Sequence, residues 1–181
     1  LQTDHIDLYY SHHDDKGVPI AETLGAYQTL ITEGKIRYIG ASQHIGARLQ
    51  EALNIATKEN LPKYICLQDQ YNLMERNPFE SEQQDVLKKN SLSALPFYGL
   101  ARGFLTGKYR LGVKVDSIRA GGVTDYQTDK GYAIIEALDK IAKAHNSIEQ
   151  GNPRRYSALK AINELEMVID KGHYVIKKCC K

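Results

Sequence analysis

The sequence has few cysteines, no long apolar run and no marked excess of either charge. Its three cysteines, Cys66, Cys179 and Cys180, do not form a disulfide framework, and Cys66 lies in an apolar segment typical of a buried small side chain. No run approaches the roughly 18 apolar residues that span a bilayer, and no basic stretch followed by an apolar one marks a secretory leader. These absences predict a reduced, cytoplasmic protein without membrane association.

The charge of the chain is nearly balanced. With 24 Lys and Arg against 22 Asp and Glu, the formal net charge is +2 at pH 7. So small an excess does not indicate nucleic acid or an anionic membrane as a partner. A length of 181 residues, with 42% hydrophobic and 25% charged residues, is ordinary for a globular protein of one domain or slightly more.

Strand-like and helix-like segments alternate along the chain as far as Phe97. Strands are predicted at 4–11, 36–42, 64–68 and 92–97, with helices between Pro19 and Gly34, over 46–59 and over 80–89. Successive strands begin about 25–30 residues apart, which is the length of one βα repeat. We therefore predict four parallel strands in that spatial order, buried on both faces.

The pattern loosens after Phe97. Glycines mark a long loop region, and helical periodicity returns over 130–145. A second amphipathic helix is predicted over 157–170. The chain therefore divides into a regular α/β part and a less regular part that follows it.

Polar or aromatic residues close each predicted strand: His12, then Ser42 with Gln43, then Gln68, then Phe97. Because the carboxyl ends of parallel strands meet at one edge of a sheet, we expect these side chains to share a rim. The alternative interpretation is structural. A histidine at a strand end is more often structural than catalytic, Ser and Gln there satisfy loose backbone groups, and Phe97 would be core.

The cluster of His12, His13, Asp14 and Asp15 suggests a zinc site at first sight. It lacks the i, i+4 spacing of metal ligands on one helix face, so no metal is predicted. Asp14 and Asp15 are interpreted as solvated loop residues.

Five stretches together resemble a known family: LQTDHIDLYYSHH, PIAETLGAYQTLITEGKIRYIGASQ, LQDQYNLMER, LPFYGLARGFLTGKYR, and RAGGV with GYAIIEALDKIAKAHN. Residues 1–149 resemble the aldo-keto reductases, of the bacterial type related to potassium-channel β subunits. The resemblance implies an α/β fold, a partial (β/α)8 TIM barrel with about four parallel βα units, the fourth to the seventh, plus an extra C-terminal helix. Residues 150–181 form an unrecognised tail that we expect to be helical.

The resemblance also implies a role for each strand-end residue. His12 matches the histidine that polarises the substrate carbonyl. Ser42 and Gln68 match residues that hold the nicotinamide carboxamide, as does Gln43, where the family usually has Asn. Phe97 matches the aromatic residue that stacks on the nicotinamide. The remaining cofactor-binding positions belong to the loop over the pyrophosphate and its continuation: Leu100, Gly103, Leu105, Gly107, Lys108 and Arg119.

The catalytic Tyr, Lys and Asp of that family precede its fourth strand, so we expect them to be absent from this chain. The resemblance implies an NADP(H)-dependent oxidoreductase that transfers hydride between nicotinamide and a small aldehyde or ketone, impaired because its general acid is missing. The alternative is a catalytically inactive fragment or pseudoenzyme that associates with another chain. The edge strands 4–11 and 92–97 would promote aggregation or a homo-oligomer, unless the 157–170 helix covers them.

Overall fold

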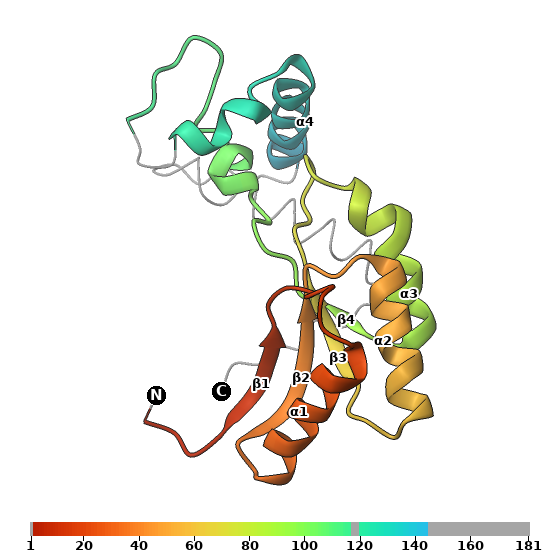
Figure 1. Cartoon of the computed structure of the whole chain (residues 1–181). Coiled ribbons are helices and arrows are strands. Elements are labelled where there is room, and N and C mark those ends of the chain that lie inside the picture. Colours follow the sequence, from red (N-terminus) through yellow and green to blue (C-terminus); the bar gives the residue numbers. More distant parts are fainter. Residues whose placement is uncertain (1, 117–119, 145–181) are drawn as a thin grey trace. The chain divides into compact units, whose positions relative to one another are not determined.

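The computed structural model describes residues 2–116 and 120–144. They belong to two compact units (Figure 1): the first comprises Leu1–Gln70 and Asn77–Phe97, the second Tyr71–Arg76 and Tyr98–Lys181. Arg119, the 150–181 tail and its predicted 157–170 helix lie outside the described residues.

The first unit is built on a parallel sheet of four strands in the order β1-β2-β3-β4, as predicted. The strands are β1 (Ile6–Ser11), β2 (Ile36–Ser42), β3 (Tyr64–Gln68) and β4 (Ser93–Ala94). The last strand is much shorter than the predicted 92–97. Beyond Ala94 the pairing continues as an isolated bridge between Gln70 and Phe97, and Pro96, between the donors Leu95 and Phe97, has its nitrogen on the side away from β3.

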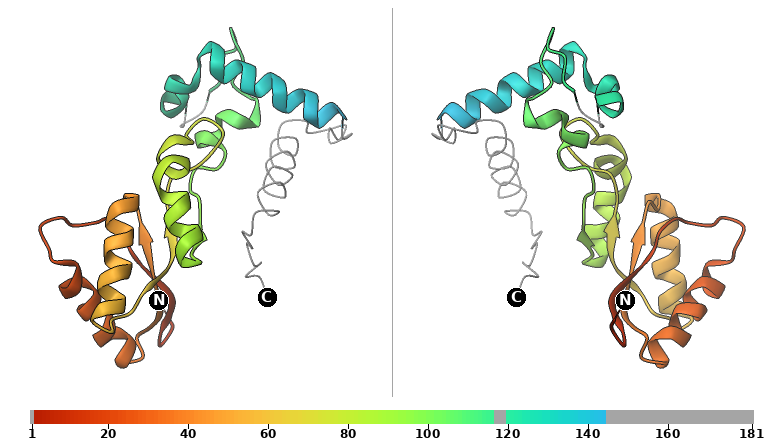
Figure 2. Two further views of the ribbon diagram at one scale, coloured as in Figure 1. Left: turned by 90° about the vertical axis from the view of Figure 1, so that its right-hand side faces the viewer. Right: turned by 90° about the vertical axis from the view of Figure 1, so that its left-hand side faces the viewer.

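Three helices follow the strands of this unit: α1 (Ile20–Thr32), α2 (Gly46–Lys58) and α3 (Gln84–Asn90). Gly34 ends α1 in a left-handed conformation (φ 70°), and its N–H donates to the carbonyl of Ile31. The third helix begins with a π-helical turn, η1 (Phe79–Gln83), where the sequence predicted a regular helix from 80. Both α1 and α2 lie on the same side of the sheet (Figure 2).

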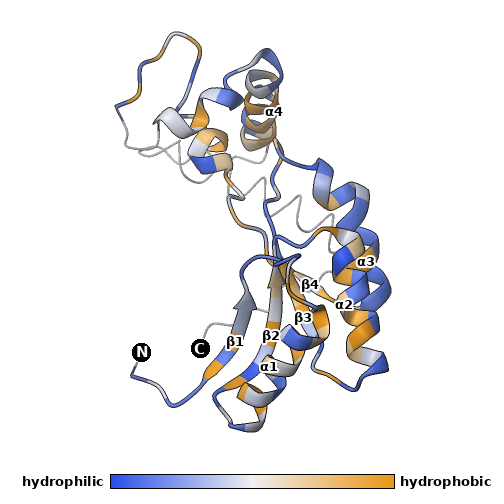
Figure 3. Ribbon diagram, in the orientation of Figure 1, coloured by the Kyte–Doolittle hydropathy of each residue, from blue (hydrophilic) through white to orange (hydrophobic). Residues whose placement is uncertain are grey.

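The core of the first unit lies between the helices and one face of the sheet. On that face Ile39, Ala41 and Leu67 are each 1% exposed or less, and the helices bury Leu24 and Leu49 against them. The opposite face carries Tyr38, which is 56% exposed. Apolar and polar segments alternate along α2 in Figure 3, as expected for a helix with one buried side.

The second unit contains two short 3-10 helices, η2 (Ala101–Thr106) and η3 (Ala120–Tyr126), and the longer helix α4 (Asp129–Ala144). The prediction of a helix over 130–145 is confirmed as far as Ala144, but the predicted loop is partly helical. Gly131 allows a close approach, because a Cβ atom there would lie 2.0 Å from the carbonyl oxygen of Tyr126. Eight buried residues of this unit form one hydrophobic cluster: Ala101, Phe104, Leu105, Tyr109, Val123, Tyr126, Ile135 and Leu138.

Among residues 2–116 and 120–144, no helix has both the length and the apolar character that crossing a membrane requires.

Candidate active site at the carboxyl ends of the strands

The carboxyl ends of β1, β2 and β3 bring four of the predicted site residues together. Ser42 is the register partner of Gln68. The backbone N–H of Gln43 donates to the carbonyl of Gln68 at 2.9 Å, and its side-chain Nε2 donates to the carbonyl of His12 at 3.3 Å. The rim predicted from the order of the strands therefore exists within the first unit.

The side-chain polar groups of Ser42 and Gln68 are available for hydrogen bonds to a ligand. Neither the Ser42 hydroxyl nor the Gln68 amide makes a hydrogen bond to any residue in the described ranges, although Ser42 is only 1% exposed. A hydroxyl and an amide side by side offer both a donor and an acceptor. That combination complements a primary carboxamide.

The ring of His12 is exposed and lies edge-on to that of His13, with the centroids 4.5 Å apart. Within the described part of the chain, no side-chain group hydrogen-bonds either ring nitrogen of His12. Its nitrogens can therefore reach a small molecule at the rim.

Gln43 adopts a left-handed conformation, with φ at 55°. Gly tolerates this conformation better than Gln does because it has no Cβ atom, and Asn does because its short polar side chain can hydrogen-bond the nearby backbone. Besides its bond to His12, the Gln43 amide lies 3.3 Å from Nε2 of His13. The extra methylene of Gln thus lets the amide hold the loop that follows β1.

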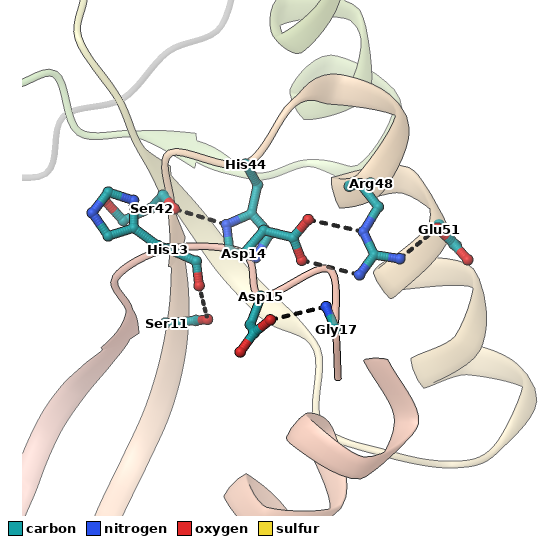
Figure 4. Close-up of polar contacts among 9 residues, drawn as sticks. All are labelled: Ser11, His13, Asp14, Asp15, Gly17, Ser42, His44, Arg48 and Glu51. Carbon is teal, nitrogen blue, oxygen red and sulfur yellow. Dashed lines mark hydrogen bonds and ion pairs between the residues drawn. The ribbon is translucent and has the colours of Figure 1, made fainter. Parts of the chain in front are cut away.

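An ion pair connects this loop to α2 (Figure 4). Arg48 on α2 donates two hydrogen bonds to the Asp14 carboxylate, from Nε at 2.9 Å and from Nη2 at 3.1 Å. Its Nη1 donates a further hydrogen bond to Glu51. The guanidinium lowers the pKa of the Asp14 carboxyl below its usual value. The interpretation of Asp14 as solvated is wrong: its side chain is only 14% exposed. No sequence pattern predicts the contact between Asp14 and Arg48, because the two residues lie 34 positions apart.

A cavity of about 450 Å³ opens beside this pair, between the end of β1, the following loop and the starts of α1 and α2. Tyr64 lines it, and burial raises the pKa of its phenol to about 12. His44 also lines it, is 4% exposed, and holds the carbonyl of Ser42 with Nδ1 at 2.8 Å. Sequence reasoning missed His44, because its role depends on the turn after β2.

Phe97 is half-buried beyond the end of β4. Its backbone N–H donates to the carbonyl of Asp69 at 3.0 Å, which places it beside the residue after β3. Phe97 therefore shares the first unit with His12, Ser42, Gln43 and Gln68.

The other predicted cofactor-binding residues belong to the second unit, in and after η2. Three consecutive residues, Ala101, Arg102 and Gly103, have positive φ values of 47°, 56° and 97°. A Cβ atom on Gly103 would lie 4.0 Å from Nζ of Lys108, so that ammonium group lies against the turn. Leu100 precedes the turn and is half-buried. A left-handed run of backbone beside a lysine is suited to binding an anion.

Two residues of this loop have evident structural roles. Leu105 is 1% exposed and packs in the core of the second unit. Gly107 ends η2 with φ at 73°, and its carbonyl accepts a hydrogen bond from Nε of Arg110 at 2.7 Å. The side chain of Leu105 is therefore not accessible to a ligand.

The described ranges contain no cluster of three or more His, Cys, Asp or Glu side chains arranged to hold a metal ion.

Comparison with known proteins identifies the fold that carries this rim. The model of the Aldo/keto reductase family matches residues 1–150. This chain belongs to the aldo-keto reductase family. It is 34% identical over 114 residues to L-glyceraldehyde 3-phosphate reductase of Escherichia coli K12, covering 63% of this chain and 33% of that protein. It is 30% identical over 148 residues to a putative voltage-gated potassium channel subunit beta of Schizosaccharomyces pombe, covering 80% of this chain and 43% of the relative.

The structure of a glycerol dehydrogenase from Gluconobacter oxydans superposes with a TM-score of 0.69 at 25% identity, over 94% of this chain and 48% of that one. The chain thus spans between a third and half of the length of these aldo-keto reductases. Its four-stranded parallel sheet is accordingly part of a (β/α)8 barrel, as the resemblance implied.

Proposed function

We propose that this chain provides the nicotinamide-binding and carbonyl-polarising side of an NADP(H)-dependent aldo-keto reductase. The observation that carries the proposal is the adjacency of Ser42 and Gln68, whose uncommitted polar groups lie at the same strand ends as the exposed ring of His12. In parallel α/β barrels, reacting groups gather at this edge.

The chemistry assigned to each residue follows from its groups. Ser42 and Gln68 hold the carboxamide, and Phe97 offers its ring to the nicotinamide face. In the second unit, Lys108 beside the left-handed turn offers a positive charge suited to a phosphate group. His12 donates a hydrogen bond to the carbonyl oxygen of a small aldehyde or ketone. The reduced nicotinamide, when bound, supplies the hydride.

Protonation of the reduced oxygen is the weak point. A positioned general acid contributes about 10²–10⁴-fold in rate, and the resemblance assigns the catalytic Tyr, Lys and Asp of the family to no residue of this sequence. We therefore propose that carbonyl reduction by this chain alone is strongly impaired.

The names of two relatives support the substrate class. One is a reductase of an aldehyde and the other a dehydrogenase of an alcohol, so both interconvert a carbonyl and a hydroxyl group. A cytoplasmic location is part of the proposal, because Cys66 is a free thiol and a reducing compartment preserves it.

The second candidate is an inactive fragment or pseudoenzyme that associates with another chain, or with a copy of itself. It is favoured by the sheet of the first unit. Within the described residues β1 and β4 are edge strands, and Tyr38 on the face opposite the helices is 56% exposed. Unpaired strand edges recruit further strands.

Two measurements test the proposal. Titration with NADPH, followed by its fluorescence, should show saturable but weak binding that Ser42→Ala and Gln68→Ala each weaken further; Gln28→Ala, on the exposed surface of α1, is the control. No binding by the wild-type chain would overturn the proposal.

NADPH consumption with 4-nitrobenzaldehyde should be indistinguishable from background, and His12→Ala should not change it. Robust turnover that His12→Ala abolishes would show instead that this chain contains a complete catalytic site.

A further inference from the structure

We infer that Gln83 is a positioning residue that locks the loops after β2 and β3 together, and so sets the spacing of the groups that hold the nicotinamide carboxamide. The inference rests on the proposed function of Ser42 and Gln68.

The contacts of Gln83 reach both loops from the π-helical turn before α3. Its Nε2 donates to the backbone carbonyl of His44 at 2.9 Å and also to Oδ2 of Asp69. His44 follows β2 and Asp69 follows β3. One amide group from a third segment therefore joins the two strand ends.

The first of these two partners is bonded to a rim residue, and the second is the chain neighbour of one, Gln68. The His44 ring holds the backbone carbonyl of Ser42 at 2.8 Å. The other carboxylate oxygen of Asp69 accepts from the backbone N–H of Gln70 at 2.7 Å. Gln83 thus acts on Ser42 through the His44 ring, and on Gln68 through Asp69, the next residue in the chain.

A glycine permits this arrangement. Gly46 opens α2, and a Cβ atom there would lie 2.8 Å from the backbone carbonyl oxygen of Glu82. Only a residue without a side chain lets the π-helical turn approach so closely. Single-turn π-helical segments are often found at functional sites, where they change the direction of a side chain.

The amide of Gln83 has one possible orientation. Both of its partners are acceptors, so Nε2 must face them and Oε1 must face away. Oε1 is buried and has no hydrogen-bond partner in the described part of the chain, while the whole residue is only 3% exposed. Leaving a buried acceptor unsatisfied is unfavourable. The site accepts this cost, which indicates that the bridge between the two loops determines the orientation.

The bridge matters for binding because a carboxamide needs its two partners at a fixed spacing. The hydrogen bond from the Gln43 N–H to the Gln68 carbonyl also joins these strand ends beyond the ladder. Without Gln83 the two loops can separate, and small displacements of positioned groups weaken binding of a rigid ligand. Ligands without nicotinamide should not sense the change.

The test compares NADPH with 2′-phospho-ADP-ribose, which lacks the nicotinamide, on the full chain. Gln83→Met keeps the shape of the side chain and removes the donor. The matched control is Gln84→Met, the same substitution at the next residue, whose side chain makes no hydrogen bond in the described ranges. A milder variant, Asp69→Asn, keeps only one carboxyl-type oxygen for the two bonds that Asp69 now accepts, so it should act in the same direction.

We expect Gln83→Met to weaken NADPH binding about five- to tenfold, as the loss of a buried hydrogen bond predicts, and to change binding of 2′-phospho-ADP-ribose less than about twofold. Gln84→Met should alter neither. Equal losses for both ligands, or no loss for NADPH in Gln83→Met and Asp69→Asn, would overturn the inference.

If the wild-type chain binds neither ligand, the proposed function fails. Whether Gln83 holds the two loops together can then still be tested without a ligand. Hydrogen exchange of the Gln43 amide, which bridges to Gln68, should be about tenfold faster in Gln83→Met than in Gln84→Met. Unchanged exchange would show that Gln83 does not hold the two loops together.

Discussion

Cys66 and Tyr10 touch across the face of the sheet opposite the helices. The Sγ atom of Cys66 lies 3.6 Å from the hydroxyl oxygen of Tyr10, although the two residues are 56 positions apart. Gly40 on β2 lies between them, next to Tyr10 in register. Burial raises the pKa of both the Tyr10 phenol and the Cys66 thiol, so both groups are neutral at pH 7.

The contact between Tyr10 and Cys66 depends on the missing side chain of Gly40. A Cβ atom at this position would lie 2.7 Å from a ring carbon of Tyr10 and 2.8 Å from Sγ of Cys66. Gly40→Ala should therefore lower the free energy of unfolding by about 1–3 kcal/mol, as overpacked sites do. Urea denaturation measures it. Gly25→Ala, in α1 with no atom within 4 Å of the new Cβ, should instead be neutral or stabilising. Equal effects of the two substitutions would contradict the packing argument.

The Asp14–Arg48 pair should make stability depend on pH in the acid range. Arg48 lowers the pKa of Asp14 in the folded chain. Stability from the pair is therefore complete above the unfolded value of about 3.9 and is lost as the pH falls through the lower folded value. At pH 7, Asp14→Asn should lower the free energy of unfolding by about 1 kcal/mol.

The difference between wild type and Asp14→Asn should disappear as the pH falls below about 4. Denaturation series at several pH values would show it, with Asp85→Asn, an exposed residue with no ion pair among the described residues, as the control. A difference that stays constant through the acid range would exclude the charge as its cause.

Tyr64 should make the folded state sensitive to alkali. Burial raises the pKa of its phenol to about 12, above the unfolded value of about 10. The contribution to stability is fully present below pH 10 and is lost as the pH rises from 10 to 12, because only the unfolded chain then releases the proton. Tyr64→Phe should flatten the loss of stability above pH 10. Tyr38→Phe, at a residue that is 56% exposed, should leave it unchanged.

Ser91 ends α3 in a left-handed conformation, with φ at 55°. Glycine adopts this conformation without a steric penalty. Ser91→Gly should therefore raise the free energy of unfolding by about 0.5–1 kcal/mol, and the melting temperature with it. Ser93→Gly, two residues later in β4, should lower it because glycine weakens a strand. Thermal unfolding distinguishes the two, and a lower melting temperature for Ser91→Gly would refute the argument.

Local pattern alone determined the framework of the first unit. The strands at 36–42 and 64–68 have the predicted bounds, and the parallel order followed from the repeat of strand and helix. The meeting of Ser42 with Gln68 also followed, because parallel strands in sequence order must place their ends together. The ligand-binding roles given to these residues stay predictions.

Only the tertiary structure decided how those ends are held. Gln83 reaches His44 across 39 positions and Asp14 reaches Arg48 across 34, and no periodic pattern marks such pairs. The π-helical turn before α3 also depends on a distant neighbour, because it requires the close approach that Gly46 permits. A sequence records which groups can form hydrogen bonds, but the partners are selected by the packing that brings distant segments within about 3 Å of each other.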